Sequence, residues 1–414
     1  MSFIKNLTGG NKFLPLIAVL ILMGLLSTDI FLPSLPQMTE YFKTTPAETV
    51  KGLSYYFITL AASFLFVGNL VDRYGRRTML LVGLMTYIAA SLSIAVAGTV
   101  TFFVASRMVQ GFSSAIINTT ARTIGRATTE PSQMGKVFSF IGMVVSISPM
   151  VAPLLGGFIE KYLFWQVSFY FLAAFAGLVF LYAFFRLPET APHKNRQERQ
   201  LEKTLSGEMK AYWLILSHLG FLSYGAILVG FFFFFGSYIG SSSFIYTQLG
   251  VAPEQFGVIF TLTAVMFLLG SASNNMLQDR IGPYNIMMIG IVLSTFGGVL
   301  LWALARAGIF HIASVMVPMM IATLGNGLAI GNAFAGSIKY FRMRAGTANA
   351  LQGFLQYGAM ASAVTIMGQR LQSGGGLAAV VALGELMMVG FVIIWCGLLG
   401  VSLIKAYRLR LQQF

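Results

Sequence analysis

The sequence predicts an all-α membrane protein with twelve transmembrane helices arranged as two six-helix bundles. Three observations support this fold class. Hydrophobic residues make up 57% of the 414 residues and charged residues only 10%, whereas soluble globular proteins carry roughly 25% charged residues. The apolar residues gather in runs long enough to cross a bilayer, which takes about 20 helical residues. The two halves of the chain also share a short polar sequence.

Twelve apolar segments follow one another along the chain. Strands of a membrane β-barrel would be about 10 residues long with strict alternation, and these runs are longer and continuously apolar, so helices are predicted. The first run follows Lys5 and Lys12, but it carries Asp29 and ends at Pro33 and Pro36 without a small-residue cleavage site. We therefore expect an uncleaved first span rather than a signal peptide. The segments are 13–35, 52–71, 78–98, 101–124, 135–158, 165–187, 211–237, 255–279, 284–305, 310–336, 345–369 and 377–404.

Positive charge is distributed unevenly between the two sides of these spans. The chain has 27 Lys and Arg and a net charge of +14. If the N-terminus lies inside, 21 of the 27 fall in inner segments, as the positive-inside rule predicts. This predicts both termini in the cytoplasm and an even number of spans, and it explains the positive charge without nucleic acid as a partner. The exceptions are Lys43, Lys51, Lys161, Arg306 and Arg370 in outer segments and Arg107 within a span.

The longest polar stretch divides the chain into two halves. Residues 188–210 hold many charged side chains between two apolar regions. We interpret them as a cytoplasmic linker with room for an interfacial helix. The predicted domains are therefore an N-terminal six-helix bundle at 1–187, the linker, and a C-terminal six-helix bundle at 211–414.

A sequence repeat relates the two halves. Residues 68–75 close the second predicted span, and residues 275–282 close the eighth with a similar sequence. Their aspartates, Asp72 and Asp279, are separated by half of the chain. Two halves of six spans in the same orientation are typical of transporters built from parallel repeats.

The first of these loops carries a recognisable motif. Residues 68–77 read G-N-L-V-D-R-Y-G-R-R, in which Gly68 and Gly75 permit close helix approach and a sharp turn. Asp72 can face a helix N-terminus or an arginine. The motif resembles the signature of the major facilitator superfamily, which implies a latch on the cytoplasmic side rather than a substrate site. Its basic residues, Arg73, Arg76 and Arg77, hold the loop in the cytoplasm.

Four further stretches resemble members of the same superfamily. Residues 107–111 are similar to the arginine motif of its proton-coupled drug exporters, and residues 187–190 to the customary end of its first half. Residues 29–36 and 241–257 resemble the Bcr/CflA drug-resistance subfamily. The resemblance spans nearly the whole chain. It implies a major facilitator fold and a drug:proton antiporter with twelve spans, which acts as a monomer in a bacterial inner membrane.

The fifth span contains a stretch that resembles the antiporter motif. Ala152 stands where that motif usually has glycine. Proline removes a backbone hydrogen bond and kinks a helix, and glycine lets helices approach closely. The spacing of these prolines and glycines is also compatible with simple close packing of the helix. The resemblance favours a hinge or seal that makes the protein exchange two solutes rather than carry one alone. The motif residues are Pro149, Pro153, Gly156 and Gly157.

Three ionisable residues are clear cases of a group placed inside lipid, away from the cytoplasmic ends of the predicted spans: Asp29, Arg107 and Glu385. Such groups are costly in lipid and indicate function by default. We expect Asp29 to carry the proton and a change in its contact with Arg107 to couple proton movement to transport, although a permanent ion pair is the alternative. Arg107 could instead only tether helices, and Glu385 could face either a cavity, as an accessory proton site, or a neighbouring helix.

Aromatic and amide side chains are candidates for the substrate cavity. Aromatic faces bind lipophilic cations and stacked rings, although a single aromatic residue in a span is more often part of the core. Amides at depth are better candidates, although they often bond only a neighbouring helix. The candidates are Tyr56, Gln110, Asn118, Tyr238, Asn326, Asn332, Phe354, Gln356 and Tyr357.

No enzyme motif accompanies these features. The sequence has no G-x-G-x-x-G, P-loop or H-E-x-x-H motif, so we expect no catalysis, no cofactor and no metal. The function predicted is proton-coupled export of small amphipathic molecules by alternating access. A dedicated metabolite or siderophore transporter, exporting or importing, is the alternative on the same fold. A membrane-embedded enzyme would need a cluster of catalytic residues within the spans, and the ionisable residues here are scattered. A receptor would be expected to carry a soluble signalling domain, and the sequence shows none. Both classes are therefore disfavoured.

Overall fold

The computed structural model describes residues 13–129, 134–189, 205–341, 344–372 and 374–411, and these residues are almost entirely helical. Ten of their helices are long and apolar enough to cross a membrane. Helices α7 (Met134–Tyr162) and α15 (Ala345–Arg370) are of similar length. With these two, the described part of the chain contains the twelve long helices that the hydropathy pattern predicts.

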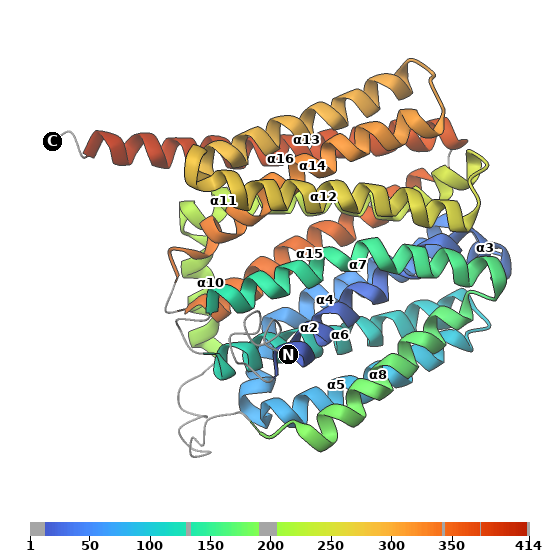
Figure 1. The fold of residues 1–414 in the computed structure, drawn as a ribbon, viewed down its shortest axis with the longest axis horizontal. Coiled ribbons are helices and arrows are strands. Elements are labelled where there is room, and N and C mark those ends of the chain that lie inside the picture. The colour runs from blue at the N-terminus through green and yellow to red at the C-terminus, as the bar shows by residue number, and fades with distance from the viewer. Residues whose placement is uncertain (1–12, 130–133, 190–204, 342–343, 373, 412–414) are drawn as a thin grey trace. The chain divides into compact units, whose positions relative to one another are not determined.

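The chain folds into two units. The first unit comprises Met1–Lys203 together with Ala252–Thr261. Figure 1 shows its helices lying side by side in blue and green. They are α2 (Leu14–Asp29), η1 (Leu32–Ser34), α3 (Leu35–Tyr41), α4 (Pro46–Tyr74), α5 (Arg76–Ala95), α6 (Val100–Thr128), α7 (Met134–Tyr162) and α8 (Gln166–Arg186).

The second unit comprises Thr204–Val251 and Leu262–Phe414. Its helices run from yellow-green to red in Figure 1. The first turns of α12 therefore belong to the first unit and its remainder to the second. The helices are α10 (Leu205–Leu216), α11 (Leu219–Gln248), α12 (Pro253–Ile281), α13 (Pro283–Arg306), α14 (Ile312–Ile338), α15 (Ala345–Arg370) and α16 (Gly376–Leu411).

The packing within the two units repeats. In the first unit α2 packs on α7 and on α6, while α5 packs on α6 and α8. In the second unit α11 packs on α15, while α13 packs on α14 and α16. The first long helix of each unit thus packs on the fifth, and the third on the fourth and sixth. This agreement supports the internal repeat inferred from the sequence.

The loops of the sequence repeat also share one backbone conformation. Gly75 has φ 92° and ψ 150°, and Gly282 has φ 87° and ψ 145°. Only glycine adopts such positive φ values without strain, so the glycine that ends each repeat sets the turn between two helices. Nothing lies within 4 Å of the place where a Cβ at Gly68 would stand. Among the described residues of the first unit, no helix thus approaches Gly68 closely.

The boundary between the halves differs from the prediction. The predicted linker falls mostly on residues 190–204, which lie outside the described residues, as do both ends of the chain. Residues 205–216 form the separate helix α10, so the predicted start of the seventh span at residue 211 is wrong. The run 241–246, predicted to lie between spans, belongs to α11. Hydroxyl groups such as that of Ser241 bond back to the preceding turn, here to the Ser237 carbonyl at 2.8 Å, so serines stay helical.

Proline residues break the first span. Helix α2 ends at Asp29, and Pro33 and Pro36 occupy the first turns of η1 and α3. Proline lacks the amide hydrogen that a continuous helix needs, so the chain restarts twice. The three pieces together still have the length of one membrane span, 28 residues.

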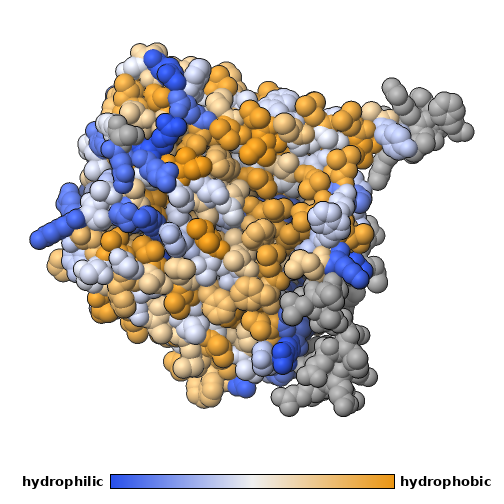
Figure 2. All heavy atoms as spheres, turned by 180° about the vertical axis from the view of Figure 1, so that it is seen from behind, coloured by the Kyte–Doolittle hydropathy of each residue, from blue (hydrophilic) through white to orange (hydrophobic). Residues whose placement is uncertain are grey.

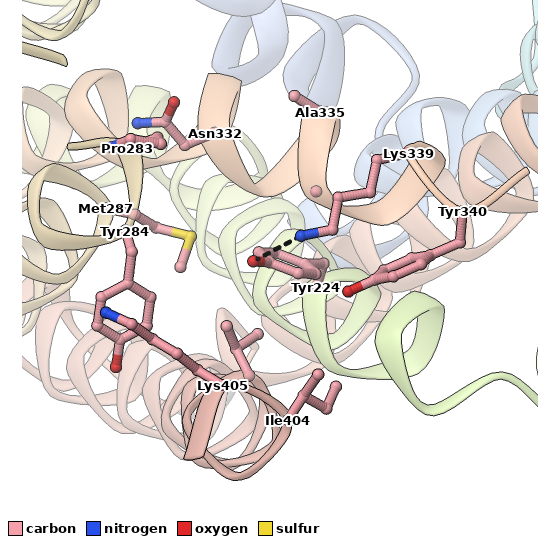
Figure 3. A pocket seen from close by; sticks show the side chains of 12 residues that line it. Tyr224, Pro283, Tyr284, Met287, Asn332, Ala335, Lys339, Tyr340, Ile404 and Lys405 are labelled. Atoms are coloured by element: carbon pink, nitrogen blue, oxygen red, sulfur yellow. Dashed lines mark hydrogen bonds between the residues drawn. The ribbon is translucent and has the colours of Figure 1, made fainter. Parts of the chain in front are cut away.

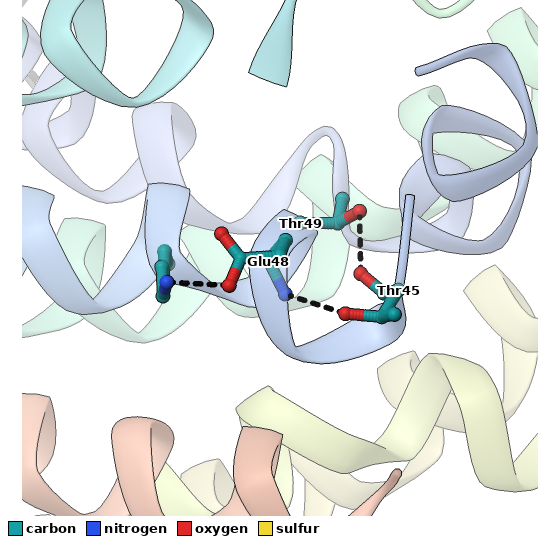
Figure 4. A network of polar contacts seen from close by, with 4 residues as sticks. Thr45, Glu48 and Thr49 are labelled. Carbon is teal, nitrogen blue, oxygen red and sulfur yellow. Dashed lines mark hydrogen bonds and ion pairs between the residues drawn. The ribbon is translucent and has the colours of Figure 1, made fainter. Parts of the chain in front are cut away.

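The second span begins with a polar cap (Figure 4). The Thr45 side chain accepts a hydrogen bond from the Glu48 backbone amide at 3.4 Å, and the Thr49 hydroxyl bonds the Thr45 carbonyl. Glu48 and Lys51 form an ion pair of 2.5 Å on the same face. The Thr45 side chain thus satisfies a free amide in the first turn of α4, which is the usual function of a threonine N-cap.

Apolar side chains cover much of the surface. Figure 2 shows hydrophobic residues across most of the visible face, with hydrophilic residues gathered towards two opposite edges. Exposed large side chains include Phe66, Leu178, Phe185 and Val392 on different helices. A soluble protein would not expose so many apolar side chains together, so this surface is suited to a lipid environment.

The N-terminus of α5 is capped by an acidic residue from the far end of the first unit. The Glu189 carboxylate accepts hydrogen bonds from the backbone amides of Arg76 and Arg77, both at 3.1 Å. A Cβ at Gly75 would collide with this carboxylate. Arg77 also donates to the Phe184 carbonyl at 2.7 Å. Glu189 rather than Asp72 therefore caps α5, and Asp72 interacts electrostatically with Arg76.

Replacement of Glu189 by alanine should lower the stability of the first unit by about 0.5–2 kcal/mol, the usual cost of losing a helix cap. The measurement is the melting temperature of the purified protein in detergent. The matched control is Glu48→Ala, which removes only an exposed pair three residues apart, worth about 0.2–0.5 kcal/mol. Equal shifts for the two variants would show that Glu189 is no more than a surface charge.

Candidate functional site

Arg107 lies at the centre of the first unit. It projects from α6 and is completely buried. Its Nε donates to the Gly52 carbonyl of α4 at 3.3 Å, and its Nη1 donates to the Ser27 carbonyl of α2 at 3.0 Å. Nη1 also donates to the Gln110 side chain one turn along α6. The guanidinium therefore joins three helices, as the tethering alternative requires.

Polar side chains extend this arrangement to α5. Gln110, itself completely buried, donates from Nε2 to the Ser91 hydroxyl at 2.8 Å. The Ser27 hydroxyl shares a short hydrogen bond with Tyr87, and the Tyr56 hydroxyl donates to the Gly24 carbonyl at 3.2 Å. Because each bond crosses between helices, the network fixes α2, α4, α5 and α6 relative to one another.

Two aromatic rings enclose the guanidinium. The Arg107 Cζ lies 4.6 Å from the centre of the Phe31 ring and 4.3 Å from that of Tyr56. Such cation–π contacts stabilise a buried positive charge. The Nη2 atom has no hydrogen-bond partner. Arg107 therefore keeps the two N–H donors of Nη2 free in a region where buried polar groups are normally paired.

Asp29 is buried without a cation. Its side chain is 3% exposed at the end of α2, and its Oδ1 accepts a hydrogen bond from the adjacent Thr28 hydroxyl at 3.0 Å. Within the described residues it forms no ion pair with Arg107, which instead contacts Ser27 and Phe31 on either side of it. The permanent ion pair that the sequence left open is therefore absent. A charged carboxylate costs much more to bury than a protonated one.

The antiporter motif packs directly against the chain that follows Asp29. A Cβ at Gly156 would lie on the Ile30 carbonyl oxygen and 3.3 Å from Pro33 Cδ. The absence of a side chain at Gly156 thus lets α7 touch the broken end of α2. Both prolines of the motif, Pro149 and Pro153, lie inside α7, which continues through them.

A neighbouring face of α7 packs against the first turns of α12, inside the first unit. A Cβ at Gly157 would meet the Pro253 carbonyl, and one at Gly257 would meet the Pro153 carbonyl. The Thr261 hydroxyl donates to the Met150 carbonyl at 2.7 Å. At the end of this contact Lys161 and Glu254 form an ion pair of 2.9 Å. Small residues thus bring the two backbones together, as is usual for helices packed in membranes.

Glu160 is a buried acidic residue that the sequence analysis missed. It is 8% exposed on α7, one turn beyond Gly156, and faces Ser34 in the broken first span. Its Oε2 has no hydrogen-bond partner. The predicted fifth span ended at residue 158, which placed Glu160 in a loop. Helix α7 runs to Tyr162, so Glu160 lies within the helix, and Ser34, which it faces, lies in η1 shortly after Asp29 in the chain.

The substrate-cavity candidates of the first unit have different environments. Tyr56 and Gln110 belong to the Arg107 network. Asn118 donates to the Ser114 carbonyl of its own helix at 3.1 Å, and a Cβ at Gly24 would meet its amide nitrogen. Asn118 therefore lies against α2 rather than facing open space.

In the second unit two of the candidate amides bond neighbouring helices. Asn326 accepts a hydrogen bond from Ser294 at 2.7 Å, and Asn332 donates to Asn274 at 2.6 Å. This is the alternative that the sequence analysis left open for amides at depth. Asn332 also lines a cavity, described below.

The remaining candidates lie on α11 and α15. Tyr238 is completely buried beside Tyr246. Phe354, Gln356 and Tyr357 share α15, and the Tyr357 ring meets Phe232 edge-on, with 5.6 Å between the ring centres. These residues do not line the cavity that contains Asn332.

Gln352 on α15 is a second residue that sequence reasoning missed. It is completely buried, and neither atom of its side-chain amide has a hydrogen-bond partner. A buried amide without partners requires an explanation, and a bound ligand is one. The only signal in the sequence is its position one turn before Gln356 on the same face.

Glu385 has a cation partner. Its Oε1 lies 2.7 Å from Nη2 of Arg306, the last residue of α13. Their side chains are 38% and 57% exposed. Glu385 thus faces a neighbouring helix, one of the two alternatives left open by the sequence. The proton site proposed below therefore does not include it.

Comparison with known proteins identifies the family. The family model described as "Major Facilitator Superfamily" matches residues 17–364. Multidrug resistance protein D of Escherichia coli (strain K12) is 26% identical over 94% of this chain and 95% of its own length. The bicyclomycin resistance protein homolog of Haemophilus influenzae is also 26% identical, over 83% of this chain and 86% of its own.

Solved structures agree on the fold. The crystal structure of a D-xylose-proton symporter superposes with a TM-score of 0.72, covering 93% of this chain and 97% of the other at 14% identity. The crystal structure of the human organic anion transporter MFSD10 superposes with a TM-score of 0.66 at 16% identity, covering 92% of this chain and 98% of the other. At such identities the likeness concerns the fold alone. The family match nevertheless covers most of the described helices, and the chain belongs to the major facilitator superfamily.

Proposed function

We propose that this protein exports small amphipathic molecules, drugs among them, in exchange for protons by alternating access. The observation that carries the proposal is Asp29, a buried carboxylate without a cation in a membrane-spanning segment. Ionisable residues in such segments mark ion pathways. The names of relatives similar along nearly the whole chain, multidrug resistance protein D among them, favour drugs and the outward direction.

The geometry around Asp29 supports a proton-dependent change of shape. The residue stands where α2 ends, and the next residue, Ile30, presents its carbonyl to Gly156 of the antiporter motif. Loss of a proton places a negative charge at this contact, and Arg107, with its free Nη2, is the nearby cation able to respond. Protonation from outside and release inside would thus alternate the packing of α2, α6 and α7.

The membrane potential can drive this cycle. One proton that moves inwards releases about 2.3 kcal/mol per 100 mV, in addition to the contribution of the pH gradient. The proposal places the protein in a bacterial inner membrane with both termini in the cytoplasm, which agrees with the distribution of Lys and Arg. One chain contains both halves of the fold, so the proposed transport unit is a monomer.

Proton movement in proteoliposomes tests the function. Purified protein is reconstituted with a pH-sensitive dye inside the vesicles and exposed to lipophilic cations, neutral drugs, sugars and siderophores in turn. Proton movement that depends on a lipophilic cation or drug is the expected result. Movement that depends only on one metabolite would favour the dedicated transporter. Folded protein that moves protons with none of the compounds would contradict proton coupling.

A further inference from the structure

A cavity lies within the second unit, apart from the residues of the proposed proton site. It has a volume of about 450 Å³ and opens between the first turns of α11 and α13 and the last turns of α14 and α16. Figure 3 shows Lys339 and Lys405 around it, together with Tyr224, Tyr284 and Tyr340. The polar residues that line it are Tyr224, Tyr284, Asn332, Lys339, Tyr340 and Lys405.

The two lysines bring positive charge without a matching negative charge. Lys339 Nζ lies 3.5 Å from the Tyr224 hydroxyl and 4.9 Å from the centres of the Tyr224 and Tyr340 rings. Lys405 Nζ lies 4.5 Å from the centre of the Tyr284 ring. No carboxylate lines the cavity, and within the described residues neither lysine forms an ion pair. The aromatic rings orient both ammonium groups but do not neutralise them.

The walls of the cavity add two further features. Pro283 and Tyr284, which begin α13, lie at its edge, so the positive end of a long helix faces the same space. Met287, Val401 and Ile404 make the rest of the lining apolar. Hydroxyl donors, two ammonium groups and a helix N-terminus together suit a phosphate group, and the apolar wall suits a hydrocarbon chain attached to it.

The place of the cavity in the membrane points to the same chemistry. Helix α13 begins here at Pro283, shortly after Arg280, and α14 ends here at Ile338, with Lys339 as its C-cap. The distribution of basic residues predicts this end of the helices to be cytoplasmic. Basic pockets between helices on that side are suited to the phosphate groups of anionic lipids.

We infer that this cavity binds a phosphate group between Lys339 and Lys405, carried either by an anionic phospholipid of the inner leaflet or by a soluble phosphate compound. The lipid would hold its headgroup between the lysines and lay its acyl chains along Met287 and Ile404. The soluble compound would use only the polar contacts. Either ligand would link the ends of α11, α13, α14 and α16, because the lining residues come from all four.

The test compares thermal stability with three probes. The full-length protein is purified in detergent and melted with dihexanoyl-phosphatidylglycerol, with dihexanoyl-phosphatidylcholine, and with inorganic phosphate, all at equal concentration and ionic strength. A ligand that binds only the folded state raises the melting temperature. The expected rise with phosphatidylglycerol is about 2–4 °C, with a smaller effect or none for phosphatidylcholine.

Lysine variants show whether the cavity causes the rise. Lys339→Gln and Lys405→Gln should each remove most of it, whereas Lys405→Arg should keep it because the positive charge remains. The matched control is Lys210→Gln, which removes the same charge from an exposed position on α10 outside the cavity. A rise that survives in both cavity variants, or that disappears equally in Lys210→Gln, overturns the proposal.

The probes separate the two sources of phosphate. Stabilisation by phosphatidylglycerol but not by inorganic phosphate assigns the site to a lipid, and equal stabilisation by both assigns it to a soluble phosphate compound. Stabilisation by phosphatidylcholine as strong as that by phosphatidylglycerol would show that the negative charge is irrelevant, which contradicts the site. None of these results depends on transport, so the proposed function and this site can fail independently.

Discussion

Replacement of Asp29 by asparagine should reduce substrate-dependent proton movement in proteoliposomes by about 100-fold or more, the lower range for loss of a positioned proton carrier. Asparagine has nearly the shape of aspartate, and its amide can still accept the bond from Thr28. It cannot bind and release a proton at physiological pH. Because the variant also removes the cost of burying a negative charge, its melting temperature should equal or exceed that of the wild type.

Two matched substitutions control for the loss of a carboxylate. Glu385→Gln makes the same chemical change at an ion-paired and partly exposed position, and it should leave proton movement intact. Glu160→Gln makes it at a second acidic residue that is buried in the described part of the first unit. If Asp29→Asn keeps coupled transport while Glu160→Gln loses it, the proton site is at Glu160. If Asp29→Asn fails to insert into the membrane, Asp29 is structural and the proposal is wrong.

Replacement of Gly156 by alanine should destabilise the first unit by about 3 kcal/mol or more, at or above the upper end of the usual cost of overpacking. The new Cβ would lie on the Ile30 carbonyl oxygen, which is a backbone atom and cannot turn away as a flexible side chain can. Relief requires α7 to move from the end of α2, and this movement also displaces Asp29. We therefore expect both a lower melting temperature and a loss of transport.

Gly177→Ala is the matched control for this substitution. Gly177 lies in α8, and nothing stands within 4 Å of the place where its Cβ would be. The same change there should leave stability unchanged or raise it by up to about 1 kcal/mol, because alanine favours a helix more than glycine does. A Gly156→Ala protein with the melting temperature and the transport rate of the wild type would show that α7 and α2 do not touch as described.

The helices themselves could be predicted closely from the sequence. Most predicted spans differ from the observed helices by a few residues, because a run of apolar residues long enough to cross a bilayer has few alternatives to a helix. The error at α10 and α11 arose where this argument is weakest. Polar serines remained inside α11 because their hydroxyls bond within the helix, and hydropathy does not report such bonds.

The site could be predicted only in part. The cost of burying charge in lipid singled out Asp29 and Arg107, and both are buried in the structure. The same argument did not find Glu160, whose helix was predicted to end too early, or Gln352, which is neutral. Nor could it show which acidic residue caps α5. The Glu189 cap joins residues more than a hundred positions apart. The sequence around either residue does not indicate that the two lie in contact.

By itself the sequence determined the class of protein, the number of spans, the internal repeat and the residues whose burial must be costly. These properties depend on the solubility of each segment in lipid, which is a local property. Tertiary structure alone decided that Arg107 binds the Ser27 and Gly52 carbonyls rather than Asp29, and that Gly156 touches Ile30. It also placed Lys339 and Lys405 around one cavity. Such contacts depend on how helices rotate against one another, and many residues far apart in the chain set that rotation together.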